Sequence, residues 1–331
     1  MANRAQLTKP IVAGVSSTRG CGQLHLLTGQ RVERDLLDTT SLSPVRQRVC
    51  ALAARLSPAA RWLMGPVRCV TRWQTGQMTE LSGRRRIIVT GGSRGIGAAI
   101  CQAFAQLGDA VAVHCGAGRD AATALVASLP GSGHVVAQAD LRDPDAVRVM
   151  VDEAAAVLGG IDVLVNNAGV FVAHEIDKVT YEEWQQAWAD TLGVNLVGAA
   201  NVTWCAVRHM PRDGSARIVN VGSRGAFRGE PRCPAYGASK AALAAFGQSL
   251  ARALGSSGVS VTTVAPGFVE TDMAAASLKG EAGIIRRAES PFNRVASPAE
   301  IADAVVYLAS RQAQWASGSI LDLNGASYLR M

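Results

Sequence analysis

The stretch "RIIVTGGSRGIGAAI", which spans residues 86–100, decides the fold of this chain. It opens with a short apolar run, continues through a loop with glycines at positions 91, 92, 95 and 97, and ends in small and apolar residues typical of a helix. Glycine permits positive φ and lets other groups approach the backbone closely, because it has no Cβ. The stretch therefore predicts a strand, a tight loop and a helix in succession.

Six further short apolar runs follow the first. They are "AVAVH" near residue 112, "HVVAQ" near 136, "IDVLVNN" near 163, "ARIVNV" near 219, "VSVTTVA" near 262 and "SILDL" near 321. Because the runs are continuously apolar rather than alternating, they indicate strands buried on both faces, as in a parallel sheet covered by helices. Helix-like segments lie between them, such as residues 143–158, where apolar residues recur at helical spacing. We expect an α/β fold: a single Rossmann-type, doubly wound parallel sheet of about seven strands with helices on both faces.

The positive charge is confined to the first quarter of the chain. Residues 1–80 hold 11 of the 33 Lys and Arg and 4 of the 26 Asp and Glu, which leaves 22 of each kind for residues 81–331. A nucleic-acid-binding domain usually carries its basic patch on the folded module. We therefore expect no nucleic-acid partner, although a basic extension that binds nucleic acid stays an alternative. Residues 81–331 are expected to form one domain that carries the whole site.

Residues 1–80 lack strand and helix alternation and predict a basic extension. It could be disordered, could be translated upstream of a true start at Met78, or could be an organelle transit segment. Glu33, Asp35 and Asp38 argue against the transit segment, which is usually poor in acids. We expect a cytoplasmic protein, with a plastid or mitochondrion as the alternative.

Other sequence signals are missing. No stretch approaches 18 consecutive apolar residues, so no membrane association is expected. The seven cysteines have no repeated spacing and fit neither a disulfide framework nor a zinc site, so we expect no metal.

The spacing G-x-x-x-G-x-G at Gly91, Gly95 and Gly97 predicts a phosphate-binding turn. Amide N–H groups and a helix N-terminus can face a pyrophosphate when no side chains intervene. A turn that is merely tight is the alternative, but a strand, loop, helix and second strand in succession favour a dinucleotide site.

From about residue 82 to residue 323 the chain resembles the classical short-chain dehydrogenase/reductase family, beginning with its T-G-x-x-x-G-I-G motif at residues 90–97. Further motifs follow in the family's order: "AD" ending at Asp140, "NNAG" at residues 166–169, "VN" ending at Asn195, Ser223, "YGASK" at residues 236–240 and "PGFVET" at residues 266–271. The similarity is closest to the 3-oxoacyl-[acyl-carrier-protein] reductase type, through "SPFNRVASPAEIADAVVYLAS" at residues 290–310. The resemblance implies an oxidoreductase that acts on CH–OH and C=O groups with NAD(P).

Tyr236 and Lys240 lie four residues apart, on one face of an expected helix. A nearby ammonium would lower the pKa of tyrosine from its usual value of about 10. An ordinary amphipathic helix face is the alternative, but Ser223 closes an apolar strand thirteen residues earlier. The resemblance implies these catalytic roles: Tyr236 as proton donor, Ser223 orienting the substrate carbonyl, Lys240 holding the nicotinamide ribose and tuning Tyr236, and Asn195 supporting a water-mediated proton relay.

The expected cofactor is NADP(H), with NAD(H) less favoured. NAD enzymes place an acid after the second strand for the ribose 2′-OH, but "VAVHCGAGRD" has no Asp or Glu at 114 or 115. Arg94, and further His114 and Arg119, could meet a 2′-phosphate. Asp140 resembles the family's adenine-contacting acid, and its alternative role, helix capping, suits Asp143 better. The expected cofactor contacts are Gly91, Ser93, Arg94, Gly95, Ile96, Gly97, His114, Asp140, Leu141, Asn167, Ala168, Gly169, Tyr236, Lys240, Pro266, Gly267, Val269 and Thr271.

The resulting hypothesis is an NADP(H)-dependent reductase of a ketone, with a 3-oxoacyl thioester of fatty acid biosynthesis, carrier-protein-bound or free, as the leading substrate. A sugar, polyol, steroid or other small carbonyl compound is the alternative. A catalytically silent NADP(H) sensor or scaffold is a third hypothesis, which the presence of Ser223, Tyr236 and Lys240 opposes. Residues 272–291 are expected to form a substrate lid.

The family resemblance also implies a homo-oligomer, either a tetramer or a dimer. The sequence "LNGA" at residues 323–326 departs there from the Asp-Gly-Gly that often follows the family's last strand. Cys233 invites a redox-switch hypothesis, with a passive thiol as the favoured alternative. Arg224, Arg228 and Arg232 could attract an acidic carrier protein or an anionic substrate, and a solvated loop is the competing interpretation.

Overall fold

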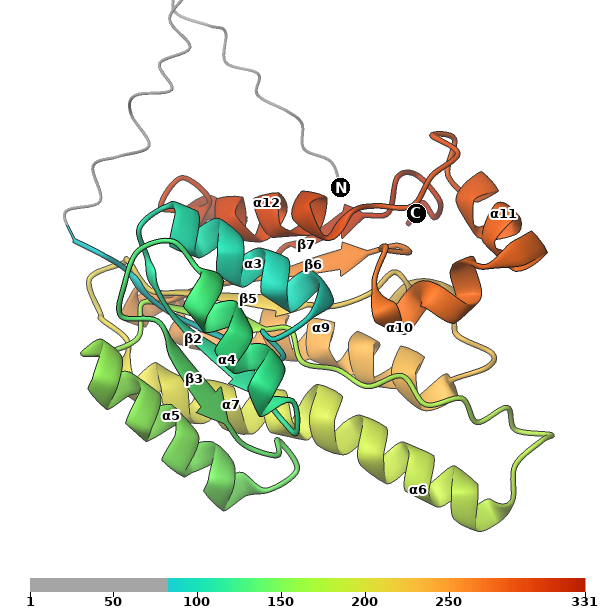
Figure 1. Ribbon diagram of the computed structural model, residues 1–331, viewed down its shortest axis with the longest axis horizontal. Helices are drawn as coiled ribbons and strands as arrows, with labels where there is room; N and C mark the ends of the chain where they lie inside the picture. The colour runs from blue at the N-terminus through green and yellow to red at the C-terminus, as the bar shows by residue number, and fades with distance from the viewer. Residues whose placement is uncertain (1–82, 331) are drawn as a thin grey trace, which may run out of the picture. The chain divides into compact units, whose positions relative to one another are not determined.

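A computed structural model describes residues 83–330 (Figure 1). The expected basic extension, residues 1–80, lies outside the described residues. Seven strands form one parallel sheet in the order β3-β2-β1-β4-β5-β6-β7, which confirms the predicted doubly wound fold. The strands are β1 (Arg86–Val89), β2 (Ala110–Cys115), β3 (Val135–Gln138), β4 (Val163–Asn166), β5 (Arg217–Val221), β6 (Ser260–Pro266) and β7 (Ile320–Leu323).

Helices cover both faces of the sheet. They are α3 (Gly95–Gln106), α4 (Arg119–Ser128), α5 (Pro144–Leu158), α6 (Tyr181–Leu192), α7 (Ala199–Ala206), α8 (Gly225–Arg228), α9 (Pro234–Leu254), α10 (Asp272–Ala275), α11 (Gly280–Ala288) and α12 (Pro298–Leu308). Helices α3, α4 and α12 pack on one face, and α5, α7 and α9 pack on the other. In Figure 1, α3 and α12 lie along the top of the view and α5 and α7 along its lower part. None of these helices is long and apolar enough to cross a bilayer.

The two helical layers explain why the strand sequences are continuously apolar. Ile87 and Val89 of β1 face the core under α3, whereas Ile88 faces the core over α5 and α7. Successive side chains of a strand point to opposite faces, so a strand covered on both sides needs an apolar residue at every position.

Helix α5 begins as expected. The Asp143 side chain accepts hydrogen bonds from the backbone N–H groups of Asp145 and Ala146 at 3.0 and 3.1 Å, and Pro144 occupies the first helical position. Capping by Asp143 leaves the Asp140 side chain out of the helix start.

The loop between β1 and α3 needs its glycines because other backbone comes very close to it. Gly91 has φ of +61°, and a Cβ there would lie 2.9 Å from Ala168 Cα. A Cβ on Gly97 would lie 2.1 Å from the Gly91 carbonyl oxygen. The first turn of α3 can therefore pack against the loop only without a side chain at position 97.

We expect Gly97→Ala to destabilise the fold by about 1–3 kcal/mol, because the added methyl forces the backbone of the loop to move. Urea denaturation measures the change. Gly116→Ala is the matched control, since a Cβ at Gly116 meets no heavy atom within 4 Å. Equal stability of the two variants would contradict this account of the loop.

Candidate active site

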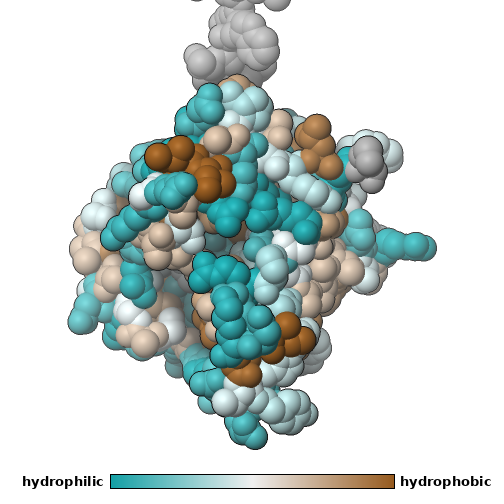
Figure 2. Space-filling view, turned by 90° about the vertical axis from the view of Figure 1, so that its right-hand side faces the viewer, coloured by the Kyte–Doolittle hydropathy of each residue, from teal (hydrophilic) through white to brown (hydrophobic). Residues whose placement is uncertain are grey.

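The predicted site residues gather at the edge of the sheet where the parallel strands end. Ser223 follows β5, Asn167 follows β4, and the glycine loop follows β1. Figure 2 faces this edge, where hydrophilic side chains cover the centre and hydrophobic patches lie above and below. A crevice outside the carboxyl ends of the strands is where open α/β sheets bind ligands.

Tyr236 and Lys240 stand one turn apart near the start of α9, as the sequence predicts. Lys240 Nζ lies 5.8 Å from the centroid of the Tyr236 ring and donates a hydrogen bond of 2.8 Å to the Val221 carbonyl oxygen. Ser223 lies close enough to the Tyr236 phenol to lower its pKa, and the Ser223 hydroxyl oxygen accepts from the Gly225 N–H at 3.0 Å. The three predicted catalytic side chains are therefore brought together.

Burial is the main cause of the pKa shifts of Tyr236 and Lys240. Desolvation raises the pKa of Tyr236 to about 12 against the opposing hydrogen bond from Ser223, and desolvation lowers the pKa of Lys240 to about 8. The expected lowering of the Tyr236 pKa by Lys240 is not found. The ammonium is directed to the Val221 carbonyl instead.

Asn195 lies in a π-helical turn, Gly193–Gly198, between α6 and α7. Its Oδ1 accepts from the Val170 N–H at 2.8 Å, and its Nδ2 donates to the Val170 carbonyl and to Ser239 Oγ, each at 3.1 Å. Ser239 Oγ in turn donates to the Tyr236 carbonyl oxygen at 2.8 Å. Both amide hydrogens of Asn195 are thus used within the protein, where they fix the loop after β4 against α9.

The "NNAG" turn after β4 is tied to the glycine loop. Asn167 Nδ2 donates to the carbonyl oxygens of Thr90 and Gly91 at 2.9 and 3.1 Å, and Thr90 Oγ1 accepts from the N–H groups of Asn167 and Ala168. A Cβ on Gly169 would lie 3.4 Å from both Asn195 Oδ1 and Lys240 Nζ. This turn therefore joins the glycine loop to the catalytic side chains.

His114 differs from the expectation of a direct phosphate contact. The ring is buried, its Nδ1 accepts from the Gly91 N–H at 3.0 Å, and its Nε2 lies 3.1 Å from the Ala139 carbonyl oxygen. Desolvation lowers its pKa, so a neutral ring is favoured. His114 supports the glycine loop from within and has no free nitrogen for a phosphate.

Arg94 is exposed at the start of α3. A Cβ on Gly118 would lie 3.8 Å from Arg94 Nη2 and 4.0 Å from Ser93 Oγ, so both side chains lie beside the loop after β2. Arg119, in the same region, donates to Gln138 Oε1 at 3.1 Å. Arg94 therefore presents a cation where the sequence predicts the cofactor's ribose.

Asp140 is half exposed, and its carboxylate pairs with Arg142 at 2.7 Å. Hydrogen bonds from Arg142 lower the pKa of Asp140. Arg142 also pairs with Asp190 at 2.7 Å, and Leu141 is buried. An adenine contact by Asp140 stays a prediction.

The remaining predicted contacts lie around the end of β6 and the glycine loop. Gly267 donates its N–H to the Leu323 carbonyl at 3.0 Å, and Val269 forms a bridge with Ala296. Thr271 reaches the glycine loop, because a Cβ on Gly95 would lie 3.2 Å from its Cγ2. Pro266 ends β6, and Ile96 packs against the core under α3.

Two residues that the sequence did not single out also hold Tyr236 in place. His174 is buried, and its Nε2 accepts from the Ala235 N–H at 3.1 Å, at the start of α9. The Phe171 ring meets the Tyr236 ring edge-on, with centroids 5.0 Å apart. A lone histidine in the loop "FVAHEID" gives no sequence signal for capping a helix more than sixty residues away.

The arginines before Tyr236 do not form a free cationic patch. Arg224 is buried against Glu289, Arg228 lies between Glu289 and Glu230, and Arg232 pairs with Glu175 at 3.5 Å. Cys233 is fully buried, and desolvation raises its pKa to about 11, which agrees with the passive thiol.

Known proteins of similar sequence and structure identify the family of this chain. A family model described as short chain dehydrogenase matches residues 85–282. The 3-oxoacyl-[acyl-carrier-protein] reductase FabG of Vibrio cholerae is 36% identical over 242 residues, which cover 73% of this chain and 96% of the relative. A cis-4-hydroxycyclohexanecarboxylate dehydrogenase of Sinomonas cyclohexanicum is 35% identical over 254 residues, or 75% of this chain and 98% of the relative.

A solved short-chain dehydrogenase from Burkholderia cenocepacia, in complex with NADP, superposes with a TM-score of 0.67. It is 36% identical, and the match covers 73% of this chain and 97% of that one. These matches agree with the seven-stranded parallel sheet of the fold. The chain belongs to the short-chain dehydrogenase/reductase family of oxidoreductases.

Proposed function

We propose that this protein is an NADP(H)-dependent reductase that converts a ketone to a secondary alcohol, with a 3-oxoacyl thioester as its leading substrate. The observation that carries the proposal is the cluster of Ser223, Tyr236 and Lys240 at the sheet edge, next to the glycine loop. A silent cofactor sensor would have no need to keep all three groups together.

The residues around the glycine loop fit a dinucleotide phosphate. No side chain caps the start of α3, so the first amide N–H groups of this helix could bind a pyrophosphate. The end of β2 and the loop after it offer no carboxylate at 114–119, and Arg94 lies beside this loop. Arg94 would hold the 2′-phosphate and Lys240 the nicotinamide ribose, in accord with the NADP carried by the Burkholderia relative. His114 would act only through the position of Gly91.

When bound, NADPH supplies the hydride. The Ser223 hydroxyl, which lies near the Tyr236 phenol, would orient the substrate carbonyl oxygen between the two. Tyr236 would then donate its phenolic proton to that oxygen as negative charge develops there. Asn195 and Ser239 would hold the first turn of α9, and with it the phenol, in position.

The protonation of Tyr236 suits the role of proton donor. With a pKa of about 12, the phenol keeps its proton at neutral pH, as a proton donor must.

Substrate identity is the finer part of the proposal. The Vibrio and Sinomonas relatives, at nearly equal identity, are named for a carrier-bound 3-oxoacyl group and for a cyclohexane ring. Exposed apolar side chains on α10 and α11, Met273, Ile284 and Ile285, and Phe171 beside Tyr236 favour an apolar acyl chain or ring over a sugar or polyol. A cyclic or steroid ketone is therefore the second candidate. Assembly into a tetramer or dimer, and delivery of substrate by a carrier protein, belong to the same proposal.

We expect Tyr236→Phe to lower the rate of NADPH-dependent ketone reduction by about 10²- to 10⁴-fold, because the ring stays and the proton donor is lost. The rate is measured on a panel with an acyl thioester, cyclic ketones and sugars. Unchanged thermal unfolding and NADPH binding serve as the control. A variant that keeps near-original activity would show that Tyr236 is not the acid.

The pH dependence of the reduction should also follow the protonation of Lys240. Its pKa of about 8 means that the charge is present below pH 8 and is lost as the pH rises through that value. We expect kcat/KM for NADPH, which reports groups of the free enzyme, to be level below pH 8 and to fall above it. A level profile up to about pH 10, well above the Lys240 pKa, would contradict the assignment.

We expect Arg94→Ala to raise the Kd for NADPH by about 10- to 100-fold, the loss of about 1.5–3 kcal/mol from a charge-assisted hydrogen bond, and to leave the Kd for NADH nearly unchanged. Fluorescence titration measures both constants. Arg148→Ala is the control, since Arg148 lies on α5 and pairs with Asp145 of the same helix. Equal weakening of both cofactors would argue against a 2′-phosphate contact.

A further inference from the structure

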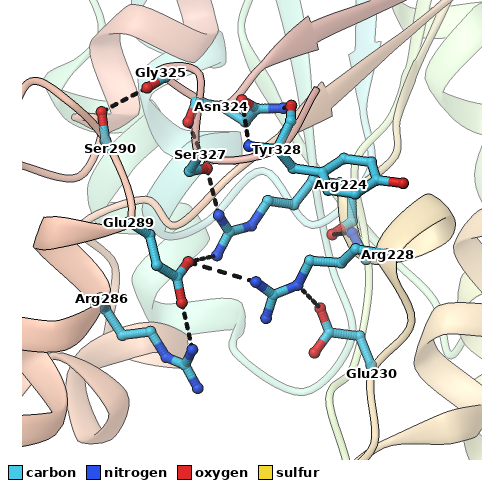
Figure 3. Close-up of polar contacts among 12 residues, drawn as sticks. Arg224, Arg228, Glu230, Arg286, Glu289, Ser290, Asn324, Gly325, Ser327 and Tyr328 are labelled. Carbon is cyan, nitrogen blue, oxygen red and sulfur yellow. Dashed lines mark hydrogen bonds and ion pairs between the residues drawn. The ribbon is translucent and has the colours of Figure 1, made fainter. Parts of the chain in front are cut away.

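Three segments far apart in the sequence meet around the Arg224 side chain (Figure 3). Arg224 directly follows Ser223, is only 3% exposed, and donates its backbone N–H to the Pro266 carbonyl at 2.9 Å. Its guanidinium contacts Glu289, just after α11, and Ser327 in the C-terminal segment. One buried side chain thus bridges the catalytic loop, the expected lid and the end of the chain.

Glu289 is the common acceptor of this junction. Besides the ion pair with Arg224, its carboxylate forms ion pairs with Arg286 Nη1 at 2.5 Å and with Arg228 Nη1 at 3.5 Å (Figure 3). Burial opposes its ionisation, but hydrogen bonds from Arg286 and Arg224 lower its pKa below the usual value. A carboxylate held by three guanidinium groups is therefore charged at neutral pH.

The end of the lid is also tied to the C-terminal segment. Ser290 Oγ donates to the Gly325 carbonyl at 2.6 Å, within the "LNGA" sequence that departs from the family pattern. Asn324 Nδ2 donates to the Tyr328 carbonyl at 2.8 Å, and Tyr328 donates its hydroxyl to the Phe227 carbonyl at 3.1 Å. The C-terminal segment therefore forms one wall of the junction.

The rest of the lid has little else to hold it. Met273, Ile284 and Ile285 are largely exposed, and Leu278 is a rare buried large side chain of this segment. Within residues 83–330, every ion pair that joins residues 272–291 to other segments ends on Glu289. The lid is thus attached to the rest of the protein by ion pairs at its C-terminal end.

We propose that Glu289 is a positioning residue that fixes the substrate lid over the Ser223 loop, with Arg224 as its buried anchor. The inference rests on the proposed function, because it takes residues 272–291 as the substrate's cover. Loss of the Glu289 charge leaves the buried Arg224 guanidinium with an uncompensated charge, so the lid end separates from the junction. Substrate binding then has to order the lid again, whereas the proton donor is untouched.

Glu289→Gln tests this. We expect KM for the ketone to rise about tenfold, while kcat changes by less than about threefold and the Kd for NADPH stays within about twofold. Limited trypsin digestion should cut the folded protein faster after Lys279 and Arg287, within the lid. Glu281→Gln is the matched control, because it removes one charge from the same helix but makes no ion pair among the described residues.

A KM and a lid cleavage rate equal to those of Glu281→Gln would overturn the proposal. If Glu289→Gln does not fold, Arg224→Met, Glu289→Met and the double variant replace it. We expect the double variant to be cut more slowly than Glu289→Met, because no unpaired charge remains buried, whereas simply additive effects would overturn the anchor. Trypsin digestion needs no substrate, so it still decides the lid's attachment if no ketone is reduced and the proposed function fails.

Discussion

The site depends on the close approach of two backbone turns, the glycine loop after β1 and the "NNAG" turn after β4. Strands β1 and β4 are parallel neighbours, so both turns leave the same edge of the sheet. Asn167 and Thr90 tie the turns together, and the missing Cβ atoms at Gly91 and Gly97 allow the contact. The glycines thus serve the protein's own packing and, in the same geometry, leave amide groups free at the start of α3.

The sequence predicts the sheet well because burial on both faces leaves a local trace. Every position of β2 is buried, so the run "AVAVH" carries the signal by itself. Asp143 was also recognisable, since a helix cap bonds only to residues close by. The catalytic cluster was predictable through the order of several motifs rather than through any single pair of residues.

Contacts between segments far apart in the chain could not be predicted from the sequence. His114 looked able to reach a phosphate, but its ring is engaged by Gly91 and by Ala139, which comes from the end of the next strand. The sequence left Arg224 either as a residue that attracts an anion or as part of a solvated loop, yet its partner Glu289 lies 65 residues further on. The Lys240 ammonium meets a carbonyl of β5, so spacing along α9 could not reveal the balance that sets the pKa of Tyr236.

The central claim is hydride transfer from a reduced nicotinamide to a carbonyl carbon at this sheet edge, with the proton from Tyr236. Reduction of an accepted ketone with NADPH deuterated at the transferring position of the nicotinamide, followed by mass spectrometry of the alcohol, tests it most directly. The account predicts deuterium on the carbinol carbon of the product. An alcohol formed without deuterium from the cofactor, or no alcohol from any ketone, acyl thioester or sugar, would contradict it.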